Sequence, residues 1–335
     1  MSSSFIHSSM TEENRPLEYA LRPRALSSFC GQPEVIEKLK VFIGAAKKRG
    51  EALGHALFHG PPGLGKTSLA HMIAHEMESN ITVTSGPLID KPSDLAGILT
   101  NLKAKDILFI DEIHRLPSSV EEYLYPAMED FSIDLLLDSG PQSRSVQIKL
   151  EPFTLIGATT RMGLLTSPMR SRFPFTCRLN YYTPSAIKEI LARSSSLLNL
   201  EITEEAFEEI AQRCRGTPRI ANNLLKWVRD YGEMRSQLPI QRLAASEALD
   251  LLQIDAKGLD EIDKRMLSYI VHQHGGGPVG INAIAAAIAE EASSLEEVNE
   301  PFLIMMGFLK RSPRGREATP LGTQHIHQYH LKEAP

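Results

Sequence analysis

Three short apolar runs occur in the first part of the chain, at residues 56–58, 107–110 and 153–157. Each is a continuous run of a few apolar residues, which is typical of strands buried on both faces of a parallel sheet. The stretches between them repeat apolar residues at helical spacing. Strands that alternate with helices predict a doubly wound α/β domain over residues 1–183.

Helical periodicity alone continues beyond residue 183, at residues 186–200, 204–214 and 218–234. We therefore expect a small all-helical domain over residues 184–256. The last segment, 257–335, predicts three helices followed by a hairpin, which is the outline of a winged helix-turn-helix. We expect the chain after Gln324 to be frayed.

Composition excludes several classes of protein. The chain has 335 residues, of which 42% are hydrophobic and 23% charged, so two or three folded domains fit and wholesale disorder does not. No stretch approaches the ~18 uncharged apolar residues of a membrane helix, and residues 1–15 are too polar for a secretory signal. The three cysteines form no CxxC pair, which argues against a disulfide framework and fits the cytoplasm.

The charge distribution narrows any contact with nucleic acid. A net charge of −5 excludes a simple polycation, so binding would need a local basic patch. One such patch lies on the predicted hairpin, or wing, and contains Lys310, Arg311, Arg314 and Arg316. The preceding helix is acidic, with Glu296, Glu297 and Glu300, and its carboxylates would repel phosphates. We expect the wing to contact the DNA backbone without reading sequence, through Arg311 and Arg316 first and Arg314 next.

Residues 60–67 read Gly-Pro-Pro-Gly-Leu-Gly-Lys-Thr, which matches GxxxxGK[ST]. The motif follows an apolar run and precedes a predicted helix, as a phosphate-binding loop does. Backbone N–H groups of such a loop and of the helix N-terminus cradle phosphate oxygens. Lys66 is expected to reach the β- and γ-phosphates of a nucleotide, and Thr67 to hold Mg²⁺.

Two carboxylates, Asp111 and Glu112, close the second apolar run. The carboxyl ends of parallel strands are where α/β sheets bind their ligands. We expect Asp111 to hold Mg²⁺, directly or through water, and Glu112 to activate the attacking water. Thr159 and Thr160 follow the third run, where a hydroxyl could sense the γ-phosphate. His114 is interpreted as a structural side chain.

Three arginines are further candidates. Arg170 and Arg172 would point the same way from an extended chain but not from a helix. One of them could reach a neighbouring subunit's γ-phosphate as an arginine finger, or it could form a surface salt bridge. Arg219 lies in the first turn of a helix that Thr217 and Pro218 begin. The helix dipole disfavours a cation there by about 0.3–1 kcal/mol, and a nearby phosphate would offset that cost.

Together these motifs resemble the AAA+ ATPases, and their ordered combination resembles the RuvB family of bacterial Holliday-junction branch-migration motors. The segments that carry the closer resemblance are 21–24, 31–33, 60–67, 84–87, 111–115, 125–130, 157–161, 216–222, 276–280 and 314–316. The resemblance runs from about Leu17 to Pro320, nearly the whole chain. The two strand-end motifs alone would indicate only a P-loop NTPase.

The resemblance implies ATP and Mg²⁺ as cofactors and assigns residues to their site. The residues implied to bind or border the nucleotide are Leu21, Arg22, Gly63, Gly65, Lys66, Thr67, Ser68, Glu129, Asp130, Phe131 and Tyr182. Thr160, with Thr159 beside it, is implied to be the first sensor and Arg219 the second. Arg172, ahead of Arg170, is implied to be the finger that acts in trans.

The resemblance also implies partners. A finger in trans completes the active site only between subunits, and the family forms homohexameric rings on duplex DNA. Residues 131–150, with Asp138 at their turn, are implied to form a hairpin that contacts RuvA, the junction-binding protein. RuvC, the resolvase, belongs to the wider complex, and no membrane is involved.

Two other functions fit parts of the sequence. A replication initiator or clamp-loader subunit of the AAA+ class would use ATP as a switch, but the acidic helix argues against a sequence-reading initiator. A protein-binding adaptor would carry a vestigial ATPase, whereas Lys66, Asp111 and Glu112 are all intact.

Overall fold

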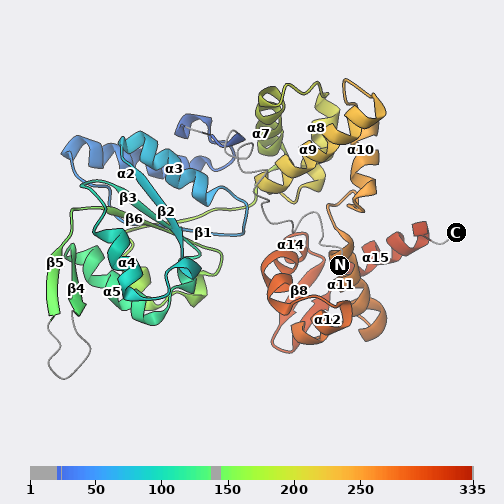
Figure 1. The fold of residues 1–335 in the computed structure, drawn as a ribbon. Coiled ribbons are helices and arrows are strands. Elements are labelled where there is room, and N and C mark those ends of the chain that lie inside the picture. Colours follow the sequence, from blue (N-terminus) through green and yellow to red (C-terminus); the bar gives the residue numbers. More distant parts are fainter. Residues whose placement is uncertain (1–20, 24, 137–144, 334–335) are drawn as a thin grey trace. The chain divides into compact units, whose positions relative to one another are not determined.

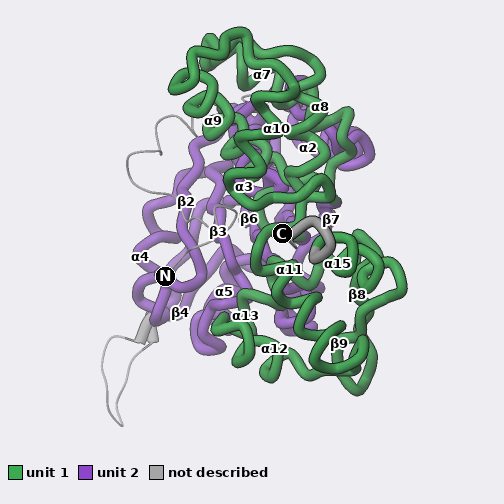
Figure 2. Tube along the Cα trace, turned by 90° about the vertical axis from the view of Figure 1, so that its right-hand side faces the viewer, with its two compact units in different colours: residues 1–21, 61–63, 181–335 green, residues 22–60, 64–180 purple. Residues whose placement is uncertain are grey.

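The computed structural model describes residues 21–23, 25–136 and 145–333. Their contacts divide the chain into two compact units, drawn in purple and green in Figure 2. The purple unit (unit 2 in the key of Figure 2) comprises Arg22–Gly60 and Leu64–Asn180 and is called the first unit, because its main segment comes first in the chain. The green unit (unit 1 in the key) is called the second unit and contains Leu21, the loop residues Pro61–Gly63 and the chain from Tyr181 onward. The contacts therefore group the two predicted C-terminal domains in one unit.

A five-stranded parallel sheet with strand order β2-β3-β6-β1-β7 forms the centre of the first unit. Its strands are β1 (Ala56–His59), β2 (Ile81–Ser85), β3 (Ile107–Asp111), β6 (Thr154–Thr159) and β7 (Phe175–Arg178). Its helices are α2 (Pro33–Arg49), α3 (Lys66–Met77), α4 (Pro92–Leu99), α5 (Ser118–Glu129) and α6 (Ser167–Ser171). Short 3₁₀ turns are η3 (Leu26–Ser28), η4 (Gly86–Leu88), η5 (Ile113–Arg115) and η6 (Met162–Leu164). Figure 1 shows α2 and α3 on one side of the sheet and α4 and α5 on the other, which confirms the predicted α/β class.

The three predicted strands are the inner strands β1, β3 and β6. They consist of continuous apolar runs because both of their faces are covered, and Phe58, Phe109 and Ile156 are fully buried. The sequence pattern missed β2 and β7, which lie at the two edges of the sheet. Edge strands are partly exposed, as Val83 is at 48%, so they carry polar residues that interrupt the apolar run.

A separate antiparallel pair forms the hairpin that was predicted within residues 131–150. Its strands are β4 (Ser132–Leu136) and β5 (Ser145–Lys149), and Ile133 lies opposite Ile148. Ile133 is buried in the core of the first unit, whereas Val146 is 43% exposed. The predicted turn at Asp138 lies outside the described residues.

The second unit begins with a helical lid, in which α10 is the helix that the sequence pattern missed. The lid helices are α7 (Pro184–Leu197), α8 (Glu204–Arg213), α9 (Pro218–Arg235) and α10 (Arg242–Leu251). Within α10, Ala244, Ala248 and Leu249 are buried at helical spacing. Alanines form a weak apolar stripe, which explains why the pattern did not stand out.

A winged-helix head follows the lid, as predicted, and ends in the wing β8–β9. Its elements are α11 (Glu261–Ser268), the π-helical turn η7 (Tyr269–Gln273), α12 (Ile281–Ile288), α13 (Ala292–Ser294), the π-helical turn η8 (Leu295–Asn299), α14 (Glu300–Met305), β8 (Leu309–Ser312), β9 (Gly315–Ala318) and α15 (Pro320–Glu333). The expectation of a frayed end after Gln324 is wrong, because α15 continues past it and Ile326 is fully buried in the head. Among the described residues, no helix has the length and apolar character needed to span a bilayer.

His55 is held in the interior of the first unit in one tautomer. The backbone N–H of Leu155 lies 2.9 Å from Nδ1, and the carbonyl oxygen of Met128 lies 3.0 Å from Nε2. An N–H can only donate and a carbonyl can only accept, so the ring is neutral and carries its proton on Nε2. Burial lowers the pKa of His55 below its usual 6.5.

This environment predicts that acid weakens the fold. Because the pKa is lower in the folded chain than in the unfolded chain, the unfolded chain binds a proton first as the pH falls below about 6.5. We expect the denaturant midpoint to decrease between about pH 7 and pH 5, and to decrease less for His55→Gln. An equal decrease in both proteins would contradict this assignment.

Candidate functional site

Lys66 and Gly65 before it form the candidate phosphate site of the first unit. α3 begins at Lys66 directly after Gly65, whose φ of 99° is left-handed. The Lys66 side chain is buried, and its Nζ donates to the carbonyl of Gly60 over 2.8 Å. Since Gly65 has no side chain, the first turn of α3 has no side-chain cap. The loop thus offers a cation and an uncapped helix N-terminus to an anion, with the Thr67 hydroxyl next in the chain.

Asp111 and Glu112 lie where β3 ends, at the same edge of the sheet as Lys66, namely the edge formed by the carboxyl ends of the parallel strands. Asp111 Oδ1 accepts the backbone N–H of Glu112 over 2.9 Å. Glu112 adopts a left-handed backbone with φ of 47°, and its Oε2 lies 2.9 Å from Nη1 of Arg115. Both side chains of this ion pair are about half exposed, so water screens it. The motif pattern gave no sign of the Arg115 contact, although Arg115 follows Glu112 by three residues.

The two threonines after β6 differ in their surroundings. Thr159 is buried, and its Oγ1 lies 2.9 Å from Nδ1 of His114 and accepts the N–H of Arg161. Thr160 is half-buried and follows it at the edge where β6 ends. Because β6 lies between β3 and β1, this position is between Asp111 and the loop after β1. The arrangement favours Thr160 over Thr159 as a group that contacts a ligand, with His114 in the structural role predicted for it.

Arg172 lies at the opposite edge of the sheet from Lys66, where 'edge' means the line of strand ends: Lys66 is at the carboxyl ends of the parallel strands and Arg172 at their amino ends. It comes just before β7, and β7 runs parallel to β1, which ends at the phosphate loop. Its Nε lies 3.1 Å from Glu129 Oε1, and its guanidinium lies 4.1 Å from the centre of the Tyr125 ring. Arg170 is inside the short helix α6, where its Nη2 donates to Ser167 Oγ. The two arginines therefore have different contacts within the chain.

The predicted nucleotide residues Glu129, Asp130 and Phe131 lie at this second edge too. The Phe131 ring centre is 5.9 Å from that of Phe153 and 6.4 Å from that of His55, and these two residues precede β6 and β1. A strand of four residues spans roughly 13 Å, so within one chain this group is distant from Lys66. Their placement near a nucleotide stays a prediction, and it would need the nucleotide of a neighbouring chain.

The tip of the phosphate loop packs on the start of α9 within the second unit. The N–H of Arg219 lies 3.4 Å from the carbonyl oxygen of Gly63, and a Cβ on Gly63 would meet Thr217 Cγ2 at 2.7 Å. Thr217 begins α9, as predicted, but its hydroxyl donates to Arg215 O instead of capping the helix. Arg219 itself is exposed in the uncapped first turn. This is a second helix N-terminus that offers N–H groups to an anion.

Two of the three residues predicted at the adenine end are buried, and Arg22 is half-buried. In the second unit, Leu21 and Tyr182 are 3% and 5% exposed. The carbonyl of Leu21 accepts from Arg193, and the N–H of Tyr182 donates to Gly216 O over 2.9 Å. In the first unit, burial and then the charge of Arg22 lower the pKa of His71. Arg22 therefore lies near α3, which begins at the phosphate loop.

The wing corrects the expected distribution of charge. Arg316 is 8% exposed, and its Nη2 lies 2.8 Å from both Glu300 Oε2 and Glu296 Oε1. Arg311 is exposed but lies 3.1 Å from Glu296 and 3.2 Å from Glu300. Glu296 and Glu300 therefore pair with Arg311 and Arg316 in the folded head, which reduces the free positive charge of the wing. Arg314, at the turn between β8 and β9, is exposed like Arg311.

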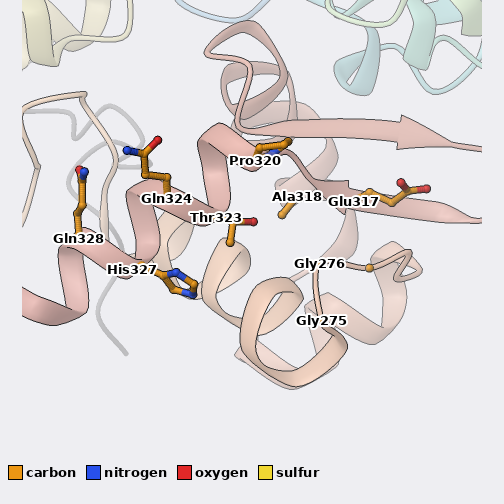
Figure 3. A pocket seen from close by; sticks show the side chains of 10 residues that line it. Gly275, Gly276, Glu317, Ala318, Pro320, Thr323, Gln324, His327 and Gln328 are labelled. Atoms are coloured by element: carbon orange, nitrogen blue, oxygen red, sulfur yellow. The ribbon is translucent and has the colours of Figure 1, made fainter.

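The head also has an open hollow of about 660 Å³ between the 275–277 turn, β9 and α15 (Figure 3). Gln324, His327 and Gln328 from α15 line one side, and Glu317 of β9 lines another. None of the predicted DNA-binding arginines lines it. The hollow is therefore separate from the candidate sites.

Comparisons with known proteins agree over nearly the whole chain. Family models match as Holliday junction DNA helicase RuvB P-loop domain over residues 21–179, RuvB AAA lid domain over 182–255 and RuvB C-terminal winged helix domain over 256–327. The Holliday junction branch migration complex subunit RuvB of Protochlamydia amoebophila is 59% identical, covering 97% of this chain and 98% of the relative. That of Chlorobaculum parvum is 56% identical, covering 92% and 90%. The solved structure of the Thermotoga maritima RuvB Holliday junction branch migration motor has a TM-score of 0.85 at 49% identity, covering 92% of this chain and 98% of that chain.

Proposed function

Since the chain belongs to the RuvB family and is an ATP-hydrolysing motor for Holliday-junction branch migration, we propose that it works as a hexameric ring on duplex DNA, together with RuvA. The observation that carries the ring is the opposite placement of two half-sites. Lys66 and Glu112 lie at one edge of the sheet and Arg172 at the other. Each chain therefore supplies a phosphate site to one neighbour and a finger to the other.

The residues of the first edge fit ATP with Mg²⁺. The Lys66 ammonium and the N-terminus of α3 match the β- and γ-phosphates, and Thr67 and Asp111 supply the oxygen ligands that Mg²⁺ prefers. Bound Mg²⁺ neutralises negative charge on the phosphates. Glu112 takes a proton from the attacking water. To do so, its carboxylate must first release Arg115 and then accept a hydrogen bond from that water. Thr160 orients the water or the γ-phosphate from the neighbouring strand end.

Other residues supply the remaining nucleotide contacts. Backbone N–H groups of Gly63 and Gly65, together with Ser68, bind phosphate oxygens. Leu21, Arg22 and Tyr182 border the adenine end. Arg219 senses the γ-phosphate from the first turn of α9, where a phosphate relieves the unfavourable placement of a cation.

The second edge acts on the neighbour's nucleotide. Arg172 is already held by Glu129 and Tyr125 within its own chain, so its guanidinium has a defined position before the ring closes. There it neutralises charge that develops on the transferring phosphate. Glu129, Asp130 and Phe131 approach the same nucleotide from this edge.

The wing contacts the DNA backbone. Arg314 and Arg311 are the exposed cations, and backbone contacts suit a motor that must move along any sequence. Arg316 orients the wing through Glu300, and a phosphate that it binds must compete with that carboxylate. The carboxylates therefore set how tightly the wing holds DNA.

This competition gives a measurable prediction. Glu296→Gln removes one competitor of Arg311 and Arg316, so we expect DNA to bind about threefold to tenfold more tightly, with a salt dependence steeper by about one ion. Binding of a labelled duplex across a salt series measures both. Glu291→Gln, an exposed carboxylate of the same head, serves as the matched control. Unchanged affinity in Glu296→Gln would mean that neither arginine contacts DNA.

The hairpin β4–β5 contacts RuvA. It stands apart from the main sheet, and Val146 exposes an apolar side chain on it. RuvC joins the wider complex, and the assembly works in the cytoplasm. An AAA+ initiator or clamp-loader switch is not favoured, because the relatives named above are branch-migration proteins over nearly their full length.

The decisive experiment is ATP-dependent dissociation of a synthetic four-way junction, with and without purified RuvA. We expect dissociation that requires ATP, is increased by RuvA and is abolished by Glu112→Gln. ATP hydrolysis without dissociation, in the presence of RuvA of verified activity, would favour the ATP-gated switch instead.

A further inference from the structure

One buried arginine of the lid is bound almost entirely by the head. Arg215 is 4% exposed and lies directly before the Gly216–Arg219 segment that contacts the phosphate loop. Its Nη2 lies 2.5 Å from Asp263 Oδ2 and 3.1 Å from Asp260 Oδ2. Both carboxylates belong to the start of α11, in the head. The guanidinium of Arg215, from the predicted lid domain, is thus buried against the predicted head domain.

Further contacts fix the plane of this guanidinium. Its Nε donates to Gly258 O over 2.9 Å, and its carbon lies 4.6 Å from the centre of the Phe302 ring in α14. Asp263 in turn accepts the amide of Asn299 over 2.7 Å. Burial raises the pKa of the Asp263 carboxyl, and the charge of Arg215 opposes that rise. Arg215 therefore contacts Gly258 before α11, the start of α11 and the α14 helix that precedes the wing.

The backbone at Arg215 carries the same connection toward the nucleotide. Its φ of 58° is left-handed, as is that of Gly216, so the chain turns sharply between α8 and α9. A Cβ on Gly216 would meet Tyr182 O at 2.8 Å, which leaves no room for a larger residue. Within the next three residues, Thr217 and Arg219 meet Gly63 of the phosphate loop. One short segment thus contacts the phosphate loop at one end and the head at the other.

We infer that Arg215 is the positioning residue that makes the lid and the head move as one body, so that the nucleotide state at Arg219 reaches the wing. The single compact unit formed by Pro61–Gly63, the lid and the head supports this. The inference rests on the proposed ATP and DNA sites. It adds the path between them: without Arg215, hydrolysis continues while the head no longer follows the lid.

The contact of Arg215 with Asp260 and Asp263, called the joint below, can be tested independently of motor activity by measuring a distance. Spin labels at Leu243 of α10 and Leu321 of α15, both exposed, report the lid-to-head distance in the full chain with Cys30 replaced by serine. We expect one narrow distribution that is the same with ADP and with a non-hydrolysable ATP analogue, and a broad one in Arg215→Met. A wild-type distribution that is broad, or that shifts with the nucleotide, would overturn the inference.

Coupling is measured as ATP consumed per junction dissociated. In Arg215→Met we expect ATP turnover within about twofold of wild type but about tenfold more ATP per junction, since a coupling of this kind is typically 5–150-fold. Arg229→Met is the matched control, because Arg229 pairs with Asp230 within α9, away from the joint. Wild-type coupling in Arg215→Met would also overturn the inference.

Two further variants guard against a folding defect. Arg215→Met leaves buried carboxylates without their cation and can unfold the chain. Asp263→Asn keeps the side-chain size and removes one charge, and we expect the same broadening and loss of coupling to a smaller degree. Arg215→Lys retains the charge and should restore part of the coupling. If the wild type dissociates no junctions, the proposed function fails. The distance measurement still shows whether Arg215 holds the lid and the head together.

Discussion

Replacing Arg172 with alanine is expected to lower ATP turnover by the DNA-bound ring by about 10³-fold or more, the range that arginine fingers supply in phosphoryl transfer. Nucleotide affinity of the isolated chain should change little, because Arg172 and Lys66 lie at opposite edges of the sheet. Phosphate release measures turnover, and a fluorescent ATP analogue measures affinity. Arg170→Ala is the matched control, since Arg170 is exposed two positions away. A large loss in the control with none in Arg172→Ala would make Arg170 the finger.

Replacing Glu112 with glutamine is expected to lower turnover by about 10²–10⁴-fold, the usual contribution of a general base. ATP binding should persist because Lys66, Thr67 and Asp111 are intact. Stability should change by no more than about 1 kcal/mol, since the ion pair with Arg115 is half exposed. Glu122→Gln, an exposed carboxylate on α5, is the control. Substantial hydrolysis by Glu112→Gln would assign the proton acceptor elsewhere.

Mixing the two inactive variants tests whether the site is shared. In a 1:1 mixture, about a quarter of the interfaces pair an intact Glu112 with an intact Arg172 from the neighbour, so turnover should recover to a similar fraction. If both groups acted within one chain, no mixture would recover activity. The result is therefore qualitative and does not depend on the exact size of either defect.

The sequence was sufficient for the half of the site that is local in the chain. Lys66 and Thr67 follow one buried strand and Asp111 and Glu112 follow another, and continuous apolar runs reveal such strands. Parallel strands then bring their ends to one edge without further information. The edge strands β2 and β7 and the polar helix α15 were missed because their partial exposure removes the apolar signal.

Contacts between residues distant in sequence could not be predicted. The ion pair of Arg172 with Glu129 spans the whole β4–β6 segment, and the buried pair of Arg316 with Glu300 depends on how the wing folds back on α14. Counting charges made the wing a free basic patch, whereas its register places Arg316 under the acidic helix. The same limit explains why Arg215 attracted no attention in the sequence: its significance lies only in what surrounds it.

The phosphate site at Lys66 and the finger Arg172 lie at opposite ends of the strands of the sheet. A ring built from such subunits therefore has a polarity. Subunits that join through unlike surfaces form a heterologous interface, and repetition of that interface around an axis closes a ring whose two faces are chemically different. All wings of such a ring lie toward the same face, so a duplex threaded through it is pulled in one sense only. In a ring of this kind, the direction in which DNA moves is therefore set by which face of the ring the duplex enters.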